Sequence, residues 1–314
     1  MERVFRWCVS AALAVAVVTG AAEAADCDRA CLAAALDRYL AAVVKHDPGA
    51  APLAVGFRQT ENAINVPLGG GVWKRVTALG AVQRRYLDAV SGQAAYFGIV
   101  EEGAASAIVT ARIRVEDGMV TEAEWYLARP GDPGLNGPAQ PGRGPANLFN
   151  PAYLTSNPPP QRTVPRAQRL PRQALERIVN SYFDGITSHD GSVIVAHPGC
   201  ARIENGTLMT GPGRPSSDCA AALEKINIQM VAARRFPVID EDAGVVLATA
   251  VFIRRPGTAT PRNVFSEWFV IDEGKIRTIY AAMFYPPADL AVPNWPPYDG
   301  NWPLPASTVP SVKE

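Results

Sequence analysis

Apolar residues recur at intervals of three and four in two segments of the chain, which is typical of one face of an amphipathic helix. The first segment carries this pattern at Leu32, Leu36, Tyr39, Leu40 and Val43. The second segment carries it at Leu175, Ile178, Val179, Tyr182, Phe183 and Ile186. A His-Asp pair follows each pattern, and then Pro48 or Gly191, residues that stop a helix. The pattern therefore predicts two helices that end at these pairs.

The two segments belong to copies of one unit. Residues 39 and 182 are both tyrosines, 143 positions apart, and the same spacing relates four further identities. The repeated residues are Tyr39, His46, Asp47, Glu61 and Asn62 in the first copy and Tyr182, His189, Asp190, Glu204 and Asn205 in the second. A constant spacing over several identities indicates an internal duplication.

Each copy continues with a short strand that carries Glu-Asn, then a glycine-rich turn and a second helical stretch at 76–90 or 219–233. Strands are then expected at 94–101, 106–115 and 119–128 in the first copy and at 237–240, 244–254, 264–271 and 275–284 in the second. Asp117-Gly118 and Glu273-Gly274 are typical hairpin turns between the last two strands. Helices followed by an antiparallel meander predict an α+β fold.

The ends and the middle of the chain differ from the two copies. Residues 1–24 combine early arginines, an apolar run and Ala22-Glu23-Ala24, which predicts a cleaved signal peptide. A membrane anchor is the alternative, but the run is shorter than the ~20 residues that span a bilayer. Residues 130–171 and 287–314 are rich in proline and are predicted as a linker and a tail. The remaining ranges, 25–129 and 172–286, are the two predicted domains.

Four cysteines remain after removal of the signal peptide, in a chain expected to be periplasmic or secreted. They are Cys27, Cys31, Cys200 and Cys219. Four cysteines allow three pairings, of which local pairing, 27 with 31 and 200 with 219, is the simplest. The alternative is a metal site, but C-x3-C without a second close pair or a histidine cluster is poor zinc spacing. We therefore expect disulfides and no metal.

Charge and motifs narrow the classes of partner. The 30 basic and 30 acidic residues give a net charge of +0, so the composition shows no electrostatic footprint for nucleic acid or an anionic membrane. We expect a small hydrophobic molecule as the partner. The chain has no GxGxxG, P-loop, HExxH or GxSxG motif, so nucleotide, zinc-protease and esterase chemistry have no starting point, and no cofactor is predicted.

Several runs of sequence resemble a known family. They are CDRACL, TEN followed by LGGGVW, GIVEEG, CARIENG, RRFPVIDEDAG and EGKIR. These runs are similar to an uncharacterised tandem family, a domain of unknown function, found in exported bacterial and secreted fungal proteins. The family belongs to the nuclear transport factor 2-like superfamily, also called SnoaL-like or ketosteroid-isomerase-like. One stretch departs from the family, because Tyr285-Pro286-Pro287-Ala288 stands where its members carry PYGM.

The resemblance implies two tandem cone-shaped units, each with N-terminal helices packed on a curved antiparallel sheet around a pocket. Superfamily members include cofactor-free isomerases, dehydratases, cyclases and lyases as well as plain ligand binders, and the fold does not choose among them. One hypothesis is therefore an isomerase, dehydratase or lyase that acts on a neutral hydrophobic or aromatic substrate. The other is a non-catalytic ligand-binding or interaction module. In both, the duplication makes the chain a pseudo-dimer, as a monomer or a homodimer.

Glu61 is the first candidate for acid–base catalysis. Because side chains alternate along a strand, Phe57, Gln59 and Glu61 share one face. A carboxylate beside an apolar side chain is desolvated, which raises its pKa toward neutrality. The alternative is that Glu61 bonds the backbone at the glycine-rich turn. Trp73 and Tyr96 are predicted walls of this pocket.

The second copy supplies Glu204 as the weaker catalytic candidate, with Glu267 and Tyr280 as pocket candidates. The dipeptides at 124–125 and 267–268 are both Glu-Trp and 143 positions apart, which would make them equivalent. Aligning the hairpin turns instead places Glu124 opposite Tyr280, 156 positions later. Because turns fix strand register, we follow the turn alignment and expect different polar groups in the two pockets.

Other polar residues have simpler interpretations. His46 and His189 are expected to cap their helices, since a histidine in the last turn is favoured by the helix dipole. The acidic run at 240–242 could share a proton or bind a cation, but we expect a solvated turn matched to Arg234 and Arg235.

Overall fold

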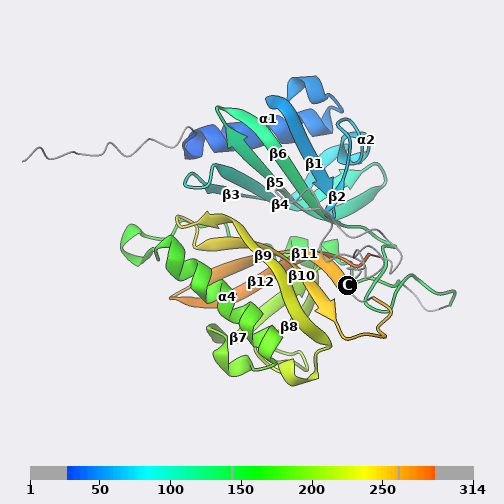
Figure 1. Cartoon of the computed structure of the whole chain (residues 1–314), viewed down its shortest axis with the longest axis vertical. Coiled ribbons are helices and arrows are strands. Elements are labelled where there is room, and N and C mark those ends of the chain that lie inside the picture. Colours follow the sequence, from blue (N-terminus) through cyan, green and yellow to red (C-terminus); the bar gives the residue numbers. More distant parts are fainter. Residues whose placement is uncertain (1–26, 143–144, 261, 287–314) are drawn as a thin grey trace, which may run out of the picture.

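The computed structural model describes residues 27–142, 145–260 and 262–286, and it contains two units that each combine one long helix with a six-stranded sheet (Figure 1). The predicted signal peptide and the predicted tail lie outside the described residues. In the described part of the chain, no helix has the length and apolar character needed to cross a membrane.

The first unit begins with helix α1 (Arg29–Val44), whose first turn is capped by the Asp28 side chain, which accepts from the Cys31 amide at 2.8 Å. Its sheet has the strand order β2-β1-β6-β5-β4-β3. The strands are β1 (Leu53–Glu61), β2 (Ile64–Asn65), β3 (Ala78–Asp88), β4 (Gln93–Glu102), β5 (Ala105–Glu116) and β6 (Met119–Ala128), and the short helices are η1 (Pro48–Ala50) and α2 (Val72–Arg75).

The second unit repeats this plan from helix α4 (Arg172–Ser188), and its sheet has the equivalent order β8-β7-β12-β11-β10-β9. The strands are β7 (Ala196–Glu204), β8 (Thr207–Thr210), β9 (Ile228–Asp240), β10 (Val245–Arg254), β11 (Arg262–Asp272) and β12 (Lys275–Phe284), and the short helices are η3 (Gly191–Val193) and η4 (Leu223–Lys225). Each long helix buries its apolar face against the inner side of its sheet. The chain therefore consists of two tandem cone-shaped α+β units.

One expectation about these strands was wrong. The stretches 76–90 and 219–233 were predicted as helices, but β3 occupies most of the first and β9 begins in the second. Each sheet is also mixed, because β1 runs parallel to β6 and β7 runs parallel to β12. The turns at Asp117-Gly118 and Glu273-Gly274 do join the last two strands, with positive φ at both residues of each turn.

The His-Asp pairs end the helices, as expected from the sequence. His46 and His189 both have a φ of 58°, the left-handed conformation that ends a helix. Each imidazole lies 2.6 Å from a main-chain carbonyl oxygen, that of Trp73 or Ile228. The aspartate after each histidine accepts from an amide two residues later and so begins η1 or η3. These repeated residues are scaffold.

The region between the units has structure of its own. It contains helix α3 (Pro151–Ser156) and the turn η2 (Arg166–Gln168). Leu154 of α3 is fully buried in a hydrophobic cluster that contains residues of both units. The linker therefore helps to cover the junction between the units.

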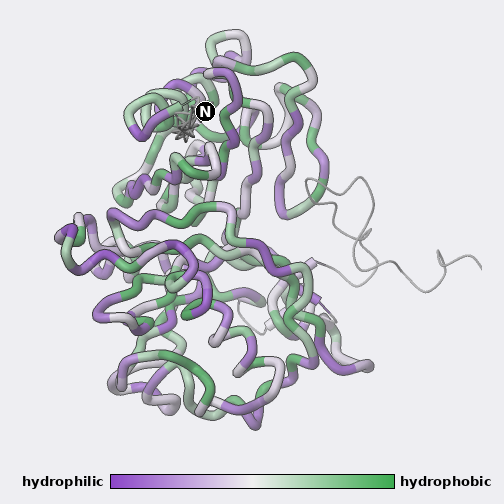
Figure 2. The backbone as a smooth tube through the Cα atoms, turned by 60° about the vertical axis from the view of Figure 1, so that its left-hand side comes forward, coloured by the Kyte–Doolittle hydropathy of each residue, from purple (hydrophilic) through white to green (hydrophobic). Residues whose placement is uncertain are grey.

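The two sheets pack against each other through their outer faces, so that α1 and α4 lie on opposite sides of the molecule (Figure 1). The same stacking is visible from a second side, with hydrophobic and hydrophilic positions interspersed along the strands (Figure 2). Phe97 of the first unit meets Trp268 and Tyr280 of the second, with ring centroids 6.1 and 6.0 Å apart. The Thr110 hydroxyl accepts from the Trp268 indole at 2.8 Å and also bonds Ser266. Apolar burial and buried hydrogen bonds thus join the units.

Two aspartates form matched links across this junction. Asp240 accepts from the Leu87 amide at 2.8 Å and pairs with Arg29 at 3.0 Å. Asp88 accepts from the Ile239 amide at 2.9 Å and pairs with Arg172 at 2.6 Å. Arg29 and Arg172 are 143 positions apart, the spacing of the duplication, so each unit supplies an arginine to the other. Asp240 is therefore a buried link and not the solvated turn residue that was expected.

We expect Asp240→Asn to lower the free energy of unfolding by about 2 kcal/mol, because the buried Asp240 carboxylate pairs with Arg29 and accepts from the Leu87 and Ala243 amides, and a neutral amide cannot replace all of these bonds. Urea unfolding of the full chain measures this change. Asp37→Asn is the matched control, since Asp37 pairs with Arg85 at an exposed position and should cost less than ~1 kcal/mol. Equal effects of the two substitutions would contradict the assignment of Asp240 as a link between the units.

Candidate functional site

Aromatic side chains occupy the interior of the first cone. The Tyr39 hydroxyl donates to Gln59 Oε1 at 3.0 Å and accepts from the Trp125 indole at 2.9 Å. The Trp73 indole donates to the same Gln59 oxygen at 2.8 Å. All four side chains are buried, and Tyr96 lies in the same core. Gln59, Trp73 and Tyr96, which were predicted pocket residues, thus pack as core, and Phe57 packs at its edge against Tyr39.

Glu61 lies beside this core, at the glycine-rich turn. Its Oε1 accepts from the Val72 amide at 2.5 Å, and its Oε2 pairs with Arg75 at 2.7 Å. Burial raises the pKa of Glu61, and the bond from the Val72 amide opposes this shift. A Cβ at Gly71 would lie 1.6 Å from Oε1, so the turn needs glycine for this close approach. The two oxygens of Glu61 therefore contact the first and the last residue of α2.

A second carboxylate completes the group of charges around Glu61. Glu102 binds Arg129 through two bonds of 2.7 and 2.8 Å and lies 3.5 Å from Arg75. Arg75 therefore contacts both Glu61 and Glu102. This network engages each oxygen of Glu61 with a donor of the protein.

Polar groups occupy the interior of the second cone. Arg202 pairs with Glu204 at 2.8 Å and with Glu267 at 3.1 Å. The Tyr285 hydroxyl donates to the other Glu204 oxygen at 2.5 Å. Glu267 is fully buried, and its Oε2 has no hydrogen-bond partner among the described residues. Burial raises the pKa of Glu267 to about 7, and the nearby Arg202 opposes this shift.

Strand register explains why the two interiors differ. Glu61 lies opposite Trp125 and Glu204 lies opposite Ala281, so position 125 corresponds to 281 and the turn alignment of Glu124 with Tyr280 is confirmed. On the next strands, Trp125 faces Ala111 and Ala281 faces Glu267. The indole of the first cone is thus replaced by an alanine in the second, where the Arg202 and Glu267 side chains pair.

The remaining pocket candidate lies elsewhere. Tyr280 is on the outer face of its sheet, at the junction between the units, where its hydroxyl donates to the Pro158 carbonyl at 3.2 Å. It follows that Tyr280 and Glu267 do not share a pocket. The same face carries a buried ion pair, in which Arg235 Nη2 lies 2.5 Å from Glu124 Oε1. Although burial alone would raise the pKa of Glu124, the positive charge of Arg235 lowers it.

Both predicted disulfides are present. Cys27 is bonded to Cys31 before α1, and Cys200 is bonded to Cys219 across a loop of the second unit. In the described ranges, no three histidine, cysteine, aspartate or glutamate residues are grouped so that they could hold a metal ion.

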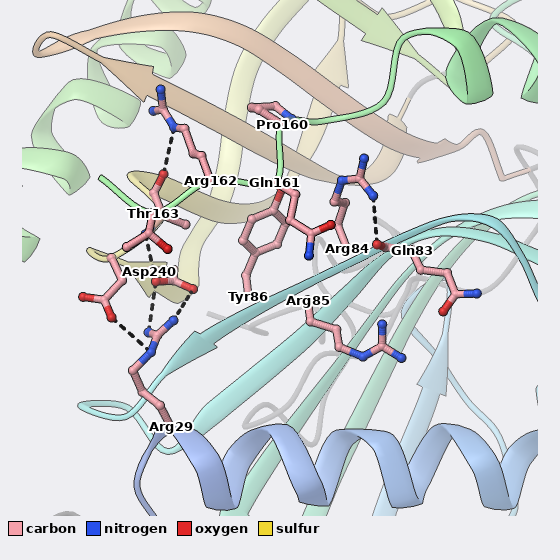
Figure 3. Close-up of a pocket in the computed structure, with 12 residues that line it drawn as sticks. Arg29, Gln83, Arg84, Arg85, Tyr86, Pro160, Gln161, Arg162, Thr163 and Asp240 are labelled. Atoms are coloured by element: carbon pink, nitrogen blue, oxygen red, sulfur yellow. Dashed lines mark hydrogen bonds and ion pairs between the residues drawn. The ribbon is translucent and has the colours of Figure 1, made fainter. Parts of the chain in front are cut away.

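Two of the cavities formed by the described residues are larger than a few water molecules. The larger, about 370 Å³, is called the junction cavity here, and Figure 3 shows the residues that line it. It is bounded by the start of α1, the strand β3, residues 160–163 of the linker and residues 240–243 after β9. The second cavity, about 300 Å³, lies between residues 164–175 and the turn after β11. Sequence patterns gave no sign of either cavity, because each is lined by segments far apart in the chain.

We compare the free energy of unfolding of the native protein with that of Glu267→Gln. We expect the difference, native minus variant, to decrease as the pH rises from 5 to 8. The folded-state pKa of Glu267 is about 7 and its ordinary value is 4.5, so the folded protein binds more protons between these values. The stability contributed by the protonated group is complete below pH 4.5 and is lost as the pH rises through 7, by on the order of 3 kcal/mol. Urea titrations at several pH values measure the difference, with Glu116→Gln as an exposed control. A difference that is constant with pH would contradict the prediction.

Comparisons with known proteins concern the fold. A family model described as "Domain of unknown function (DUF8021)" matches residues 168–283. No curated protein matches. Among solved structures, the chain is similar to a protein of unknown function with a cystatin-like fold from Methylobium petroleophilum, at 19% identity over 38% of this chain and 82% of that one, with a TM-score of 0.29.

Two further structures are similar over one unit's length. A proposed polyketide cyclase from Xanthomonas campestris is 17% identical over 37% of this chain and 92% of that one, with a TM-score of 0.28. An NTF2-like protein from Burkholderia xenovorans is 16% identical over 36% of this chain and 91% of that one, with a TM-score of 0.25.

Proposed function

We propose that the protein is an exported, non-catalytic binding module in which the two cones are scaffold and a small molecule binds in the junction cavity. One observation carries this proposal. Buried side chains pack the core of the first cone and protein donors engage both oxygens of Glu61, while a cavity of about 370 Å³ lies where the two units and the linker meet. Of the two hypotheses raised by the sequence, this geometry favours the binding module.

The size and position of the junction cavity support a small ligand. Ligand pockets commonly have volumes of roughly 300 to 1,000 Å³ and often lie at domain interfaces. The junction cavity has a volume in this range and lies between the two units. Four parts of the chain that are distant in sequence contribute to its wall. A ligand there would contact both units and the linker at once, and it would therefore stabilise their arrangement.

The two disulfides support export. Disulfides persist in oxidising compartments such as the periplasm or the extracellular space, and they are rare in the cytosol. Both pairs join cysteines of the mature chain, since the predicted signal peptide ends before Cys27. We therefore assign the protein to the periplasm or the exterior of the cell.

We expect Thr163→Trp to abolish ligand binding, because Thr163 is an exposed residue that lines the cavity and an indole there would fill it. The test is ligand-observed NMR of the native protein with a mixed panel of neutral, anionic and cationic fragments. Thr155→Trp, at an exposed position of α3 outside the cavity, is the matched control. If no fragment binds the native protein and Thr155→Trp but fails to bind Thr163→Trp, the proposed function is overturned.

A second candidate function is cofactor-free acid–base catalysis in the second cone, favoured by the unpartnered Oε2 of Glu267. In this case Glu267→Gln would reduce the turnover of hydroxylated aromatic substrates by roughly a hundredfold or more, which is the usual effect of losing a general acid or base. Glu61→Gln would leave turnover unchanged, because Glu61 is held by Val72 and Arg75. Equal rates for the native protein and Glu267→Gln would remove Glu267 from any mechanism.

A further inference from the structure

We propose that the ligand of the junction cavity is a small organic anion, a carboxylate or a phosphate monoester, bound by the Arg84 guanidinium and the Tyr86 hydroxyl. This inference rests on the proposed function and specifies the class of its ligand. It replaces the neutral hydrophobic partner that the sequence led us to expect. The reasons lie in the charges that line the cavity and in one buried hydroxyl.

The acidic side chains of the cavity are already engaged. Asp240 accepts from the Arg29 guanidinium at 3.0 and 3.1 Å, from the Leu87 amide at 2.8 Å and from the Ala243 amide at 3.1 Å. Asp242 pairs with Arg29 at 3.3 Å and also with Arg169. Because these carboxylates are neutralised by arginines of the protein, they leave little negative charge to attract a cation.

Arg84 differs from the other arginines of the cavity. Arg29, Arg85 and Arg162 each pair with a carboxylate, at 3.0, 2.6 and 3.1 Å. Arg84 donates only to main-chain carbonyls, from Nε to Pro159 at 2.6 Å and from Nη1 to Gln83 at 3.0 Å. These bonds fix the plane of the guanidinium but do not balance its charge. Within the described residues its Nη2 has no partner, so a donor and a positive charge remain for a ligand.

Tyr86 supplies the second group. It is only 3% exposed, and its hydroxyl has no hydrogen-bond partner among the described residues. The ring packs on Trp268, with centroids 4.8 Å apart, which fixes its position. Burial raises the pKa of Tyr86, so the hydroxyl stays protonated and can donate. A buried hydroxyl without a partner is costly, and a ligand oxygen would satisfy it.

The Arg84 and Tyr86 side chains are neighbours on the same face of β3. Residues two apart on a strand point to the same side, so Arg84 and Tyr86 of β3 both face the junction. Figure 3 shows both side chains on the wall of the cavity, next to Gln161 of the linker. An anion in contact with the guanidinium would therefore be within reach of the hydroxyl.

The fold does not require a hydroxyl at this position. In the strand register, Asp88 lies opposite Gln93, the first residue of β4, and Asp240 lies opposite Val245, the first residue of the equivalent strand β10. Asp88 therefore corresponds to Asp240, and Tyr86 corresponds to Val238. Val238 is fully buried in the same cluster, so an apolar residue serves the scaffold there. The Tyr86 hydroxyl is thus an addition to the first unit, which is consistent with a role in binding.

The test is isothermal titration calorimetry of the mature protein with three probes that share one ring system: 1-naphthoate, 1-naphthyl phosphate and 1-naphthamide. We expect at least one anion to bind at least tenfold more tightly than the neutral amide, with an affinity that falls as salt is added. The tighter of the two anions identifies the head group. Arg84→Gln should weaken anion binding about tenfold or more, as expected for a charge-assisted bond, and should leave amide binding unchanged.

Two further variants keep the test decisive. Tyr86→Phe retains the ring on Trp268 and should weaken anion binding severalfold, even if Arg84→Gln proves unstable. Arg114→Gln, which removes an exposed arginine paired with Glu116 outside the cavity, should change nothing.

Each adverse outcome has a distinct meaning. If 1-naphthamide binds as tightly as both anions and this binding is lost in Thr163→Trp, the assignment of the ligand as an anion is wrong, while the proposed function stands. Anion binding that neither Arg84→Gln nor Tyr86→Phe weakens would overturn the assignment of these residues. If no naphthyl probe binds but neutral fragments of the NMR panel do so in the cavity, the inference also fails. If nothing in either experiment binds in the cavity, both proposals fall.

Discussion

The outer face of each curved sheet must be buried against the other unit, and the rest of the structure depends on this constraint. The inner face of each sheet is covered by its own helix, so the outer face would otherwise expose large apolar residues such as Phe97 and Trp268. Packing the two faces together places β3 beside β9 and brings Asp88 and Asp240 within reach of the opposite unit. The junction cavity forms where these faces meet the linker.

Much of this fold could be predicted from local sequence, but the strands at the junction could not. The two long helices, the hairpin turns, the register of the last strands and the local disulfides follow from periodicity, turn chemistry and spacing. In β3, however, the buried Val82 and Tyr86 are four residues apart, a spacing that fits a helix as well as a strand. The parallel pairing of β1 with β6 joins residues 64 to 67 positions apart, which a local pattern does not specify.

The candidate site shows a similar limit. The burial of Glu61 and the rise of its pKa agree with the reasoning from its strand, but its bond to Val72 and its pairing with Arg75 depend on how the glycine-rich turn folds back. In the second cone, the sequence identified Glu267 but not its partner Arg202, which lies on another strand. A signal for the links between the units was present, because Arg29 and Arg172 share the spacing of the duplication.

The linker makes this pseudo-symmetric molecule one-sided. An assembly of two identical units would present any surface site twice, related by its symmetry axis. Here residues 160–163 cross the junction on the side of β3, and the equivalent of Tyr86 on the other side is Val238. The covalent connection, together with the difference between Tyr86 and Val238, therefore distinguishes the two sides of the junction. If the junction cavity binds a ligand as proposed, the expected stoichiometry is one ligand per chain, where two separate copies of a unit would offer either two sites or none.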